Sequence, residues 1–276
     1  MLSIGLDIGT GFVKCVSDTK KIKFPSLYAY KWIEEWNKTK KLVEAVGYDA
    51  VELSVDPDVI VIKPVMLGRP VHEKAFVELV KKAVLVSSES NDAIDSKLDH
   101  ITIGLPYDAV SYRTSMQKMI TKLYRPKTCD VVPQVLGTLV DAGYSSAVVM
   151  SIGQGTTEIV GFIENKAIRG TSVHHAVEFI SSKFGAMSYL DNFTFENKRT
   201  GELVSMLVDY LVNELHHVRQ DMEKLPVIVS GGGILVPGME KAIRAKFKDD
   251  IIIPQDPVMS NALGLYKIAS WYAKQD

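Results

Sequence analysis

Two glycine-rich segments that lie far apart in the chain constrain its fold more than any other feature. The first, at residues 7–11, is Asp-Ile-Gly-Thr-Gly, and the second, at residues 151–155, is Ser-Ile-Gly-Gln-Gly. Each lies between two apolar runs typical of strands, within segments 2–18 and 148–162. Because the copies begin 144 residues apart, they predict a duplicated core of two domains with a ligand between them.

The glycines of both segments suit an anionic ligand. A residue without a side chain lets its backbone N–H approach an anion closely, and the hydroxyl groups of Thr156 and Thr157 add donors. A glycine turn between two strands is also an ordinary β-hairpin, so one copy alone is weak evidence. The repetition favours phosphate groups between the two hairpins.

A third glycine cluster, at residues 231–233, follows the predicted strand 227–230 and precedes the predicted helix 239–247. Backbone at the carboxyl end of a strand, ahead of a helix, is a common place for a flat base or an α-phosphate. A plain loop is the alternative interpretation.

Composition excludes several classes of protein. The chain has 276 residues, 46% hydrophobic and 24% charged, which is typical of a soluble globular protein of one large or two ordinary domains. No apolar run is long enough to span a bilayer and no signal peptide is recognisable, so we expect a cytoplasmic protein without membrane insertion. The net charge of −1 argues against direct binding to nucleic acid. Cys15 and Cys129 fit neither a disulfide framework nor a zinc site.

The rest of the chain alternates strand and helix patterns, which predicts an α/β fold. Residues 28–41 suit a packed amphipathic helix, with an exposed arm as the alternative, and residues 87–97 and 189–199 are expected to be irregular. Further strands are expected at residues 20–25, 51–55, 59–65, 100–105, 131–132 and 251–253, and helices at 73–86, 111–124, 134–142, 172–184, 201–225 and 260–273.

In this order, the segments resemble the motifs of the actin/Hsp70/sugar-kinase superfamily over nearly the whole chain. Residues 7–14, Asp-x-Gly-Thr-Gly-x-x-Lys, are similar to its first phosphate motif, and residues 148–162 to its second. Residues 131–143 and 256–266 resemble its two connecting helices, and residues 230–233 its adenosine motif.

Within the superfamily, the likeness is closest to plasmid and archaeal actin-like ATPases of the ParM/StbA type. Gln134 and Ser151 are 17 positions apart, the separation of the catalytic glutamine and the second-motif aspartate of actin. The short segments that carry the likeness, in order, lie at residues 24–26, 67–68, 103–106, 133–137 and 261–266.

The resemblance implies an α/β actin-like fold, with two RNase H-like domains around a nucleotide cleft. Domain I would comprise residues 1–142, completed by the C-terminal helix 257–276, and domain II residues 143–256. The segment 163–226 leaves little room beyond core elements, so the small outer subdomain IIB of actin is expected to be reduced.

The resemblance also implies a role for each motif residue. Asp7 would hold Mg²⁺ through its water shell, Lys14 would reach the β- and γ-phosphates of ATP or GTP, and Gln134 would orient the attacking water. Phosphoryl transfer depends mainly on charge neutralisation and a positioned nucleophile, so these roles are physically reasonable. The nucleotide would also be contacted by Gly9, Thr10, Gly11, Gly153, Gln154, Gly155, Thr156, Thr157, Gly231, Gly232 and Gly233.

Ser151 departs from the resemblance, because the family usually has an aspartate there that serves the metal and the attacking water. We include Ser151 with Asp7 and Gln134 among the catalytic candidates, but a serine hydroxyl holds neither role well, so hydrolysis should be slow. Glu158 is a nearby carboxylate that could compensate if its side chain turns into the cleft.

Three functions follow from the resemblance. The first is an ATPase that self-associates into filaments and positions DNA or other cargo through a DNA-bound adaptor protein. The second is a nucleotide-binding adaptor or scaffold, similar to FtsA or PilM, with little or no hydrolysis, which Ser151 favours. The third, a small-molecule kinase, fits least because such kinases have an acidic base at this position.

Overall fold

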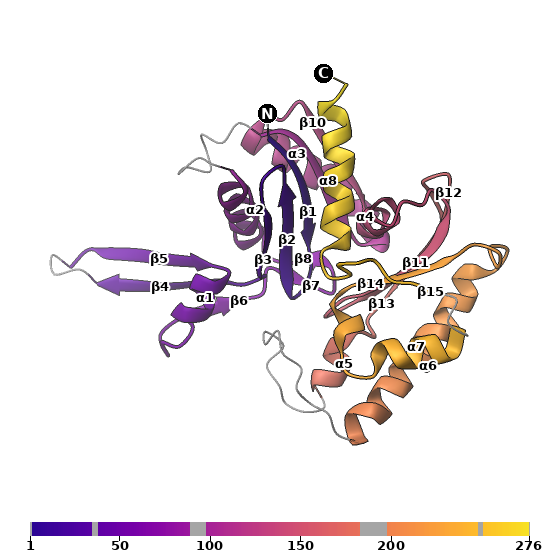
Figure 1. Cartoon of the computed structure of the whole chain (residues 1–276). Coiled ribbons are helices and arrows are strands. Elements are labelled where there is room, and N and C mark those ends of the chain that lie inside the picture. Colours follow the sequence, from indigo (N-terminus) through magenta and orange to yellow (C-terminus); the bar gives the residue numbers. More distant parts are fainter. Residues whose placement is uncertain (1, 35–37, 89–97, 183–197, 248–250, 276) are drawn as a thin grey trace.

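Each half of the chain is built on a five-stranded sheet, and the two sheets share one strand plan (Figure 1). The computed structural model describes residues 2–34, 38–88, 98–182, 198–247 and 251–275. In each half, three strands form an antiparallel meander, and two later strands lie parallel to the first of them. The duplicated core predicted from the glycine hairpins is therefore confirmed.

The strand order is β3-β2-β1-β9-β10 in the first half and β13-β12-β11-β14-β15 in the second. The first sheet comprises β1 (Leu2–Ile8), β2 (Phe12–Ser17), β3 (Lys21–Pro25), β9 (Leu98–Leu105) and β10 (Thr128–Pro133). The second comprises β11 (Ala147–Ile152), β12 (Thr157–Ile163), β13 (Lys166–Val173), β14 (Val227–Ser230) and β15 (Ile251–Ile252).

Helices cover both sheets and fill the space between them. The outer helices are α2 (Glu73–Ser87) and α3 (Val110–Tyr124) on the first half, and α5 (Val177–Ser182), α6 (Lys198–Arg219) and α7 (Met239–Phe247) on the second, with short 3₁₀ turns η1 (Tyr107–Ala109) and η2 (Gly232–Leu235). The inner helices are α4 (Gln134–Asp141) and α8 (Ser260–Ala273). Val135 and Leu139 of α4 pack on the inner face of the second sheet, whereas α8 lies against β1 of the first.

The two inner helices touch backbone to backbone. A Cβ atom added to Gly264 of α8 would lie 1.7 Å from the carbonyl oxygen of Gly137 in α4, and one added to Gly137 would lie 2.1 Å from the carbonyl oxygen of Asn261. Only glycine permits this approach, because real Cβ atoms do not come within 3.0 Å of other heavy atoms. The crossing joins the two halves.

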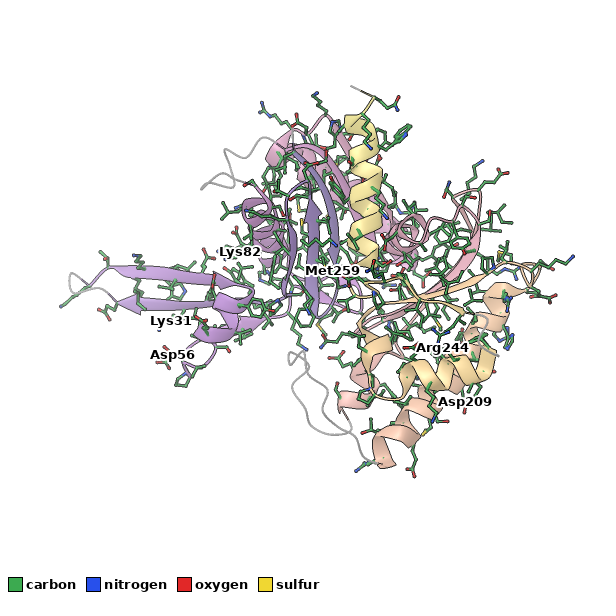
Figure 2. The ribbon with its side chains drawn as sticks, in the orientation of Figure 1. Lys31, Asp56, Lys82, Asp209, Arg244 and Met259 are labelled. Atoms are coloured by element: carbon green, nitrogen blue, oxygen red, sulfur yellow. The ribbon has the colours of Figure 1, made fainter. Side chains whose placement is uncertain are left out.

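A small third sheet projects from the first half as an arm (Figure 1). It comprises β4 (Tyr28–Glu34), β5 (Lys40–Val46) and β6 (Ile60–Ile62), with α1 (Tyr48–Leu53) packed on one face through Ala50. Lys31 and Asp56 form an ion pair of 2.5 Å between β4 and the turn after α1 (Figure 2). A two-stranded hairpin, β7 (Val65–Met66) and β8 (Arg69–Pro70), follows the arm.

The arm corrects two sequence predictions. Residues 28–41 were expected to form a packed helix, but 28–34 and 40–41 are strand, because alternate residues Tyr28, Tyr30 and Trp32 share one face and pair with β5 and β6. Residues 51–55 were expected to be a strand, but 48–53 are helical. The turn of α1 buries Ala50 against the arm, a tertiary contact that short-range apolar periodicity does not reveal.

Most other elements were predicted within a few residues, with two exceptions in the second half. Residues 172–173 end β13 and α5 begins only at Val177, so the predicted helix 172–184 is shorter. The predicted helix 201–225 ends at Arg219, whose guanidinium donates to the carbonyls of Glu223 and Leu225 and closes the chain into a turn. Residues 87–97 and 189–199 were expected to be irregular, and most of both segments lies outside the described residues. The reduction of subdomain IIB stays a prediction.

Both cysteines are free thiols, as expected. Cys15 is buried in the core of the first half beside the Ser87 hydroxyl at 3.1 Å, and burial raises its pKa to about 12. Burial and the neighbouring Asp130 carboxylate raise the pKa of the half-buried Cys129 to about 12 as well. Within the described residues, no helix combines the length and apolar character that crossing a membrane requires.

We expect Gly264→Ala to lower the free energy of unfolding by about 1–3 kcal/mol, because the added methyl group would force α4 and α8 apart. Gly201→Ala is the matched control: this helical glycine of α6 has no atom within 4 Å of an added Cβ, so alanine should stabilise by up to about 1 kcal/mol. Urea denaturation of both variants measures the difference. A Gly264→Ala protein as stable as the parent would contradict the close crossing.

Candidate nucleotide site

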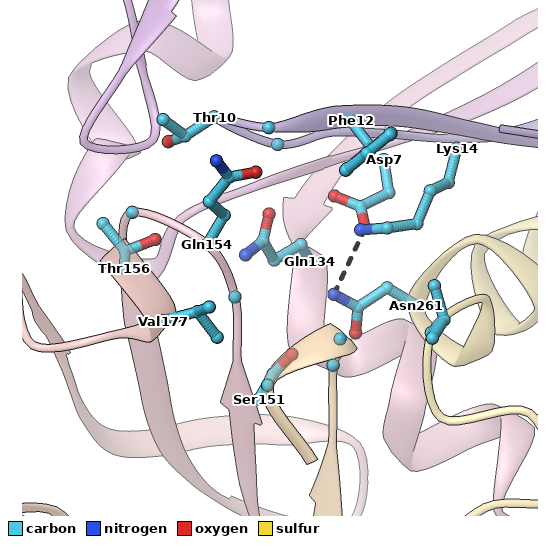
Figure 3. Close-up of a pocket in the computed structure, with 18 of the residues that line it drawn as sticks. Asp7, Thr10, Phe12, Lys14, Gln134, Ser151, Gln154, Thr156, Val177 and Asn261 are labelled. Carbon is cyan, nitrogen blue, oxygen red and sulfur yellow. Dashed lines mark hydrogen bonds and ion pairs between the residues drawn. The ribbon is translucent and has the colours of Figure 1, made fainter. Parts of the chain in front are cut away.

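A cavity of about 290 Å³ lies between the two halves, where the glycine hairpins of both sheets turn (Figure 3). Its walls come from the β1–β2 and β11–β12 hairpins, from β3, and from the first residues of α4, α5, η2 and α8. Residues from distant parts of the sequence therefore face one space, and that space is open to ligands.

Asp7 lies at the carboxyl end of β1, and its side chain is almost completely buried. The Lys14 ammonium lies 2.9 Å from Asp7 Oδ2, and the amide of Asn261 donates to the same oxygen over 3.5 Å (Figure 3). Asp7 Oδ1 has no hydrogen-bond partner among the described residues. A buried carboxylate oxygen left without a partner at a cavity wall fits a hydrated divalent cation.

The two hairpins turn in the same way and touch at their tips. In each, the N–H of the first glycine donates to the carbonyl three residues later, Gly9 to Phe12 over 3.0 Å and Gly153 to Thr156 over 2.9 Å. A Cβ on Gly11 would lie 1.6 Å from the Gln154 side chain, and one on Gly155 would lie 2.9 Å from the Thr10 side chain, so the two tips are in contact. This arrangement brings bare backbone from both halves to one wall.

Gln134 is the first residue of α4, directly after Pro133, and its side chain enters the cavity between Gln154 and Asn261 (Figure 3). Proline at this point sets the entry angle of the helix without losing a helical hydrogen bond. The Gln134 amide can thus orient a small molecule between the two halves.

A buried hydrogen-bond chain connects the cavity floor to the crossing of the inner helices. The Thr138 hydroxyl lies 2.7 Å from Asn261 Oδ1 and 2.9 Å from the Ser230 hydroxyl. Asn261 in turn contacts Asp7. These hydrogen bonds link residues from β1, α4, β14 and α8. The site and the crossing of α4 and α8 therefore share one hydrogen-bond network.

The side chain of Glu158 lies beneath the cavity floor and is not one of its lining residues. It is directly opposite Ser151 on the neighbouring strand, so both side chains share the inner face of the second sheet. Glu158 is fully buried, and neither carboxyl oxygen makes a hydrogen bond of ordinary geometry to a described residue. Burial, followed by the nearby negative charge of Asp7, raises its pKa well above the usual value, although the Tyr107 backbone N–H lowers it somewhat. Burial in the folded protein therefore favours the protonated, neutral form of the Glu158 carboxyl group.

An ion pair joins the first half of the chain to α5 of the second. The Lys63 ammonium, on the segment between β6 and β7, lies 3.6 Å from a carboxylate oxygen of Glu178 in α5. Both side chains are partly exposed, so the pair contributes little to stability. It marks where the two halves approach each other beside Val177 of the cavity wall.

The structure brings all but one of the predicted site residues to this cavity. The exception is Thr157, which is buried and donates its hydroxyl to the carbonyl of His175 over 2.7 Å. Lining residues from the prediction are Asp7, Gly9, Thr10, Gly11, Lys14, Gln134, Ser151, Gly153, Gln154, Gly155, Thr156, Gly231, Gly232 and Gly233. Those that the prediction missed are Phe12, Lys23, Val177, Leu235, Val236, Val258 and Asn261.

Solved structures of other proteins share the architecture of this chain over nearly its full length. MreB5 of Spiroplasma citri bound to AMPPNP superposes with a TM-score of 0.74 at 17% identity, covering 99% of this chain and 96% of that one. The MamK double helical filament gives a TM-score of 0.78 at 14% identity, with 98% of each chain covered. The chain has the actin-like fold. No protein-family model matches the sequence, and no curated protein matches it significantly.

The actin-like fold confirms the predicted fold class, since the likeness extends over nearly the full chain. At identities of 13–17%, the likeness concerns architecture. The narrower resemblance to ParM and StbA stays a prediction, and so do the roles of the site residues in this actin-like cleft.

The raised pKa of Glu158 has a measurable effect on stability. Because its pKa is raised in the folded protein, unfolding releases a proton between about pH 4.5 and the folded-state pKa. The free energy of unfolding should therefore fall in that range, by up to about 1.4 kcal/mol per pH unit for this group. Glu158→Gln removes this contribution. As pH rises, the parent should therefore lose stability relative to the Glu158→Gln variant.

Urea denaturation at pH 5, 6 and 7 tests this expectation. Glu202→Gln, which changes an exposed glutamate of α6, is the control and should parallel the parent. A constant offset between Glu158→Gln and the parent at all three pH values would contradict a raised pKa of Glu158.

Proposed function

We propose that this protein binds ATP or GTP with Mg²⁺ in the cleft, hydrolyses it slowly and assembles into filaments. One observation supports nucleotide binding above all: the two glycine hairpins, from sheets of the same plan, meet at one cavity beside Lys14 and the unpartnered oxygen of Asp7. Backbone N–H groups at both tips suit the phosphates, and Asp7 suits a hydrated cation.

The cavity offers a separate place for the nucleoside. Leu235 and Val236 are apolar lining residues that follow the bare backbone of residues 231–233 in the chain, and Val177 and Val258 are further apolar residues of the cavity wall. An apolar wall beside glycine backbone accommodates a flat base. These side chains carry no hydrogen-bonding group, so we do not assign a preference between adenine and guanine.

Hydrolysis would depend on Gln134 and on the charges of the phosphate end. The bound Mg²⁺ would neutralise negative charge on the phosphates, and Lys14 would add to this from the protein. Gln134 would orient the attacking water with its amide. Among the described residues that line the cavity, Asp7 is the only carboxylate, and Glu158 does not line it. Without an ionised acceptor at position 151, we infer slow turnover and a long-lived ATP state.

Assembly is proposed by analogy with the structural neighbours. One MamK structure is a double helical filament, and a second is of a non-polymerising mutant bound to AMPPNP. MreB5 has been solved with AMPPNP and with ADP. We propose the same combination of nucleotide binding and self-association for this chain, in the cytoplasm. A DNA-bound adaptor was expected only from the ParM resemblance, and no contact in the structure adds to that expectation.

A nucleotide-binding scaffold with little hydrolysis is the second candidate. The observation that favours it is the pair Ser151 and Glu158, since Ser151 has no carboxylate and Glu158 does not line the cavity. The two candidates differ in one measurable quantity. A scaffold would bind nucleotide and release no phosphate in a single turnover, whereas the proposed filament ATPase would release it slowly.

We expect Lys14→Ala to weaken ATP–Mg²⁺ binding by roughly 1.5–3 kcal/mol, the range for a charge-assisted contact. The variant also removes the partner of the buried Asp7, so its folding is checked by thermal denaturation first. Isothermal titration calorimetry then measures affinity. Unchanged affinity in a folded variant would show that the cavity is not a phosphate site.

Gln134→Ala should keep nucleotide affinity while slowing phosphate release, by roughly 10²-fold or more. The amide is expected to act on the attacking water, an interaction made in the transition state and not in the bound ground state. Calorimetry, phosphate release and sedimentation with ATP, GTP and a non-hydrolysable analogue give the three quantities. If affinity and turnover fall together, Gln134 is a binding residue and its assignment is wrong.

A further inference from the structure

Thr138 of α4 is fully buried and does not line the cavity, yet its hydroxyl is connected to the cavity wall. That hydroxyl lies 2.7 Å from Asn261 Oδ1 and 2.9 Å from the Ser230 hydroxyl. The amide nitrogen of Asn261 in turn lies 3.5 Å from Asp7 Oδ2 (Figure 3). A residue outside the cavity wall is thus linked through Asn261 to the carboxylate that suits a hydrated cation.

The hydrogen bonds of this chain can run in one direction only. Asp7 is the carboxylate partner of the Lys14 ammonium, so it can only accept. The Asn261 group that faces Asp7 must then be the NH₂, which turns the amide oxygen towards Thr138. An amide oxygen can only accept, so Thr138 donates its single O–H to Asn261 and accepts from the Ser230 hydroxyl. The Thr138 hydroxyl therefore determines which way the Asn261 amide faces.

The backbone of Asn261 is fixed independently of its side chain. The Ser260 hydroxyl donates to Asp141 Oδ2 of α4 over 2.8 Å, and a Cβ on Gly137 would lie 2.1 Å from the Asn261 carbonyl oxygen. The start of α8 is thus held against α4. Loss of the Thr138 hydroxyl would therefore act first on the Asn261 amide, which can exchange its oxygen and nitrogen by a rotation.

The orientation of the Asp7 carboxylate depends on two donors. Lys14 and Asn261 both contact Oδ2, and Oδ1 has no hydrogen-bond partner among the described residues. Two donors on one oxygen hold the carboxylate in one rotation. If the Asn261 amide turned over, its oxygen would face the carboxylate and repel it, because both groups are acceptors. The unpartnered oxygen would then lose its fixed position.

We propose that Thr138 is a positioning residue for the cation site, acting through Asn261 on Asp7. The inference rests on the proposed function, since it requires Mg²⁺ to bind at Asp7 together with the nucleotide. Removing a hydrogen bond that orients a metal ligand typically lowers metal affinity by roughly 10- to 100-fold. Because Thr138 does not line the cavity, its loss should leave the direct contacts to the nucleotide unchanged.

Calorimetry of ATP binding, with Mg²⁺ and with EDTA in its place, tests the assignment. The quantity compared is the ratio of the two affinities, which isolates the contribution of the cation. Thr138→Val keeps the shape of the side chain without its hydroxyl, and it should lower this ratio by roughly 10-fold while the affinity for metal-free ATP stays the same. Thr138→Ser keeps the hydroxyl and should retain the ratio of the parent.

Thr102→Val is the matched control, because it makes the same change at another fully buried threonine. The Thr102 hydroxyl on β9 has no hydrogen-bond partner among the described residues, and Thr102 does not line the cavity. Its replacement should leave both affinities unchanged. A fall in the ratio for Thr102→Val as large as that for Thr138→Val would overturn the inference, since any lost buried hydroxyl would then have the same effect.

A double-mutant cycle tests whether Thr138 acts through Asn261. Asn261→Ala removes one donor to Asp7 and should lower the same ratio. Adding Thr138→Val to Asn261→Ala should cause no further fall, because the two residues belong to one chain of hydrogen bonds. A further fall as large as that of Thr138→Val alone would show that Thr138 acts by another route, and the inference would be wrong.

The outcomes separate this inference from the proposed function. If Thr138→Val keeps the ratio of the parent, or loses affinity equally with and without Mg²⁺, the inference is wrong and the nucleotide site stands. Thr138→Ala, which is smaller and also lacks the hydroxyl, is judged by the same criteria if Thr138→Val does not fold. If the parent itself binds ATP equally with and without Mg²⁺, the proposed cation site fails and this inference fails with it.

Discussion

The backbone contact between α4 and α8 holds the two halves of the molecule together. Gly137 and Gly264 allow it, and Gly5 of β1 extends it on the other side of α8, where an added Cβ would lie 2.1 Å from the backbone nitrogen of Tyr266. Glycine costs a helix roughly 1 kcal/mol relative to alanine. Here that cost is offset because the inner helices can bury their apolar residues against both sheets at once, which no looser crossing would permit.

The crossing also determines where the polar groups of the cleft lie. Both inner helices begin at the cavity, so Gln134 and Asn261 are presented at its edge by the same pair of helices that joins the halves. Thr138, next to Gly137, bonds to Asn261 and Ser230, and Asn261 reaches Asp7. Any rotation of one half against the other must change these distances. These hydrogen bonds therefore connect residues that line the cleft to the joint between the halves.

Sequence patterns predicted the features that are local or repeated. They failed where the structure of a segment depends on which strands pair with each other. The helices at 239–247 and 260–273 were placed without error, because their apolar spacing lies within one element. The arm was mistaken for a helix because its short strands become evident only when β4 pairs with β5 and β6. Lys23 was missed for the same reason, since its place opposite Lys14 depends on the strand register. Thr157, which was expected in the phosphate cradle, does not line the cavity, because alternation along β12 turns it towards His175.

The two native thiols make the protein convenient for site-directed labelling. With pKa values raised to about 12, Cys15 and Cys129 have almost no thiolate at neutral pH, and thiolate is the form that reacts with maleimides. Cysteines introduced by Lys63→Cys and Glu178→Cys, one in each half of the chain, would therefore be modified selectively without first removing either native residue. A pair of short-range probes at these positions would report opening and closing of the cleft in solution.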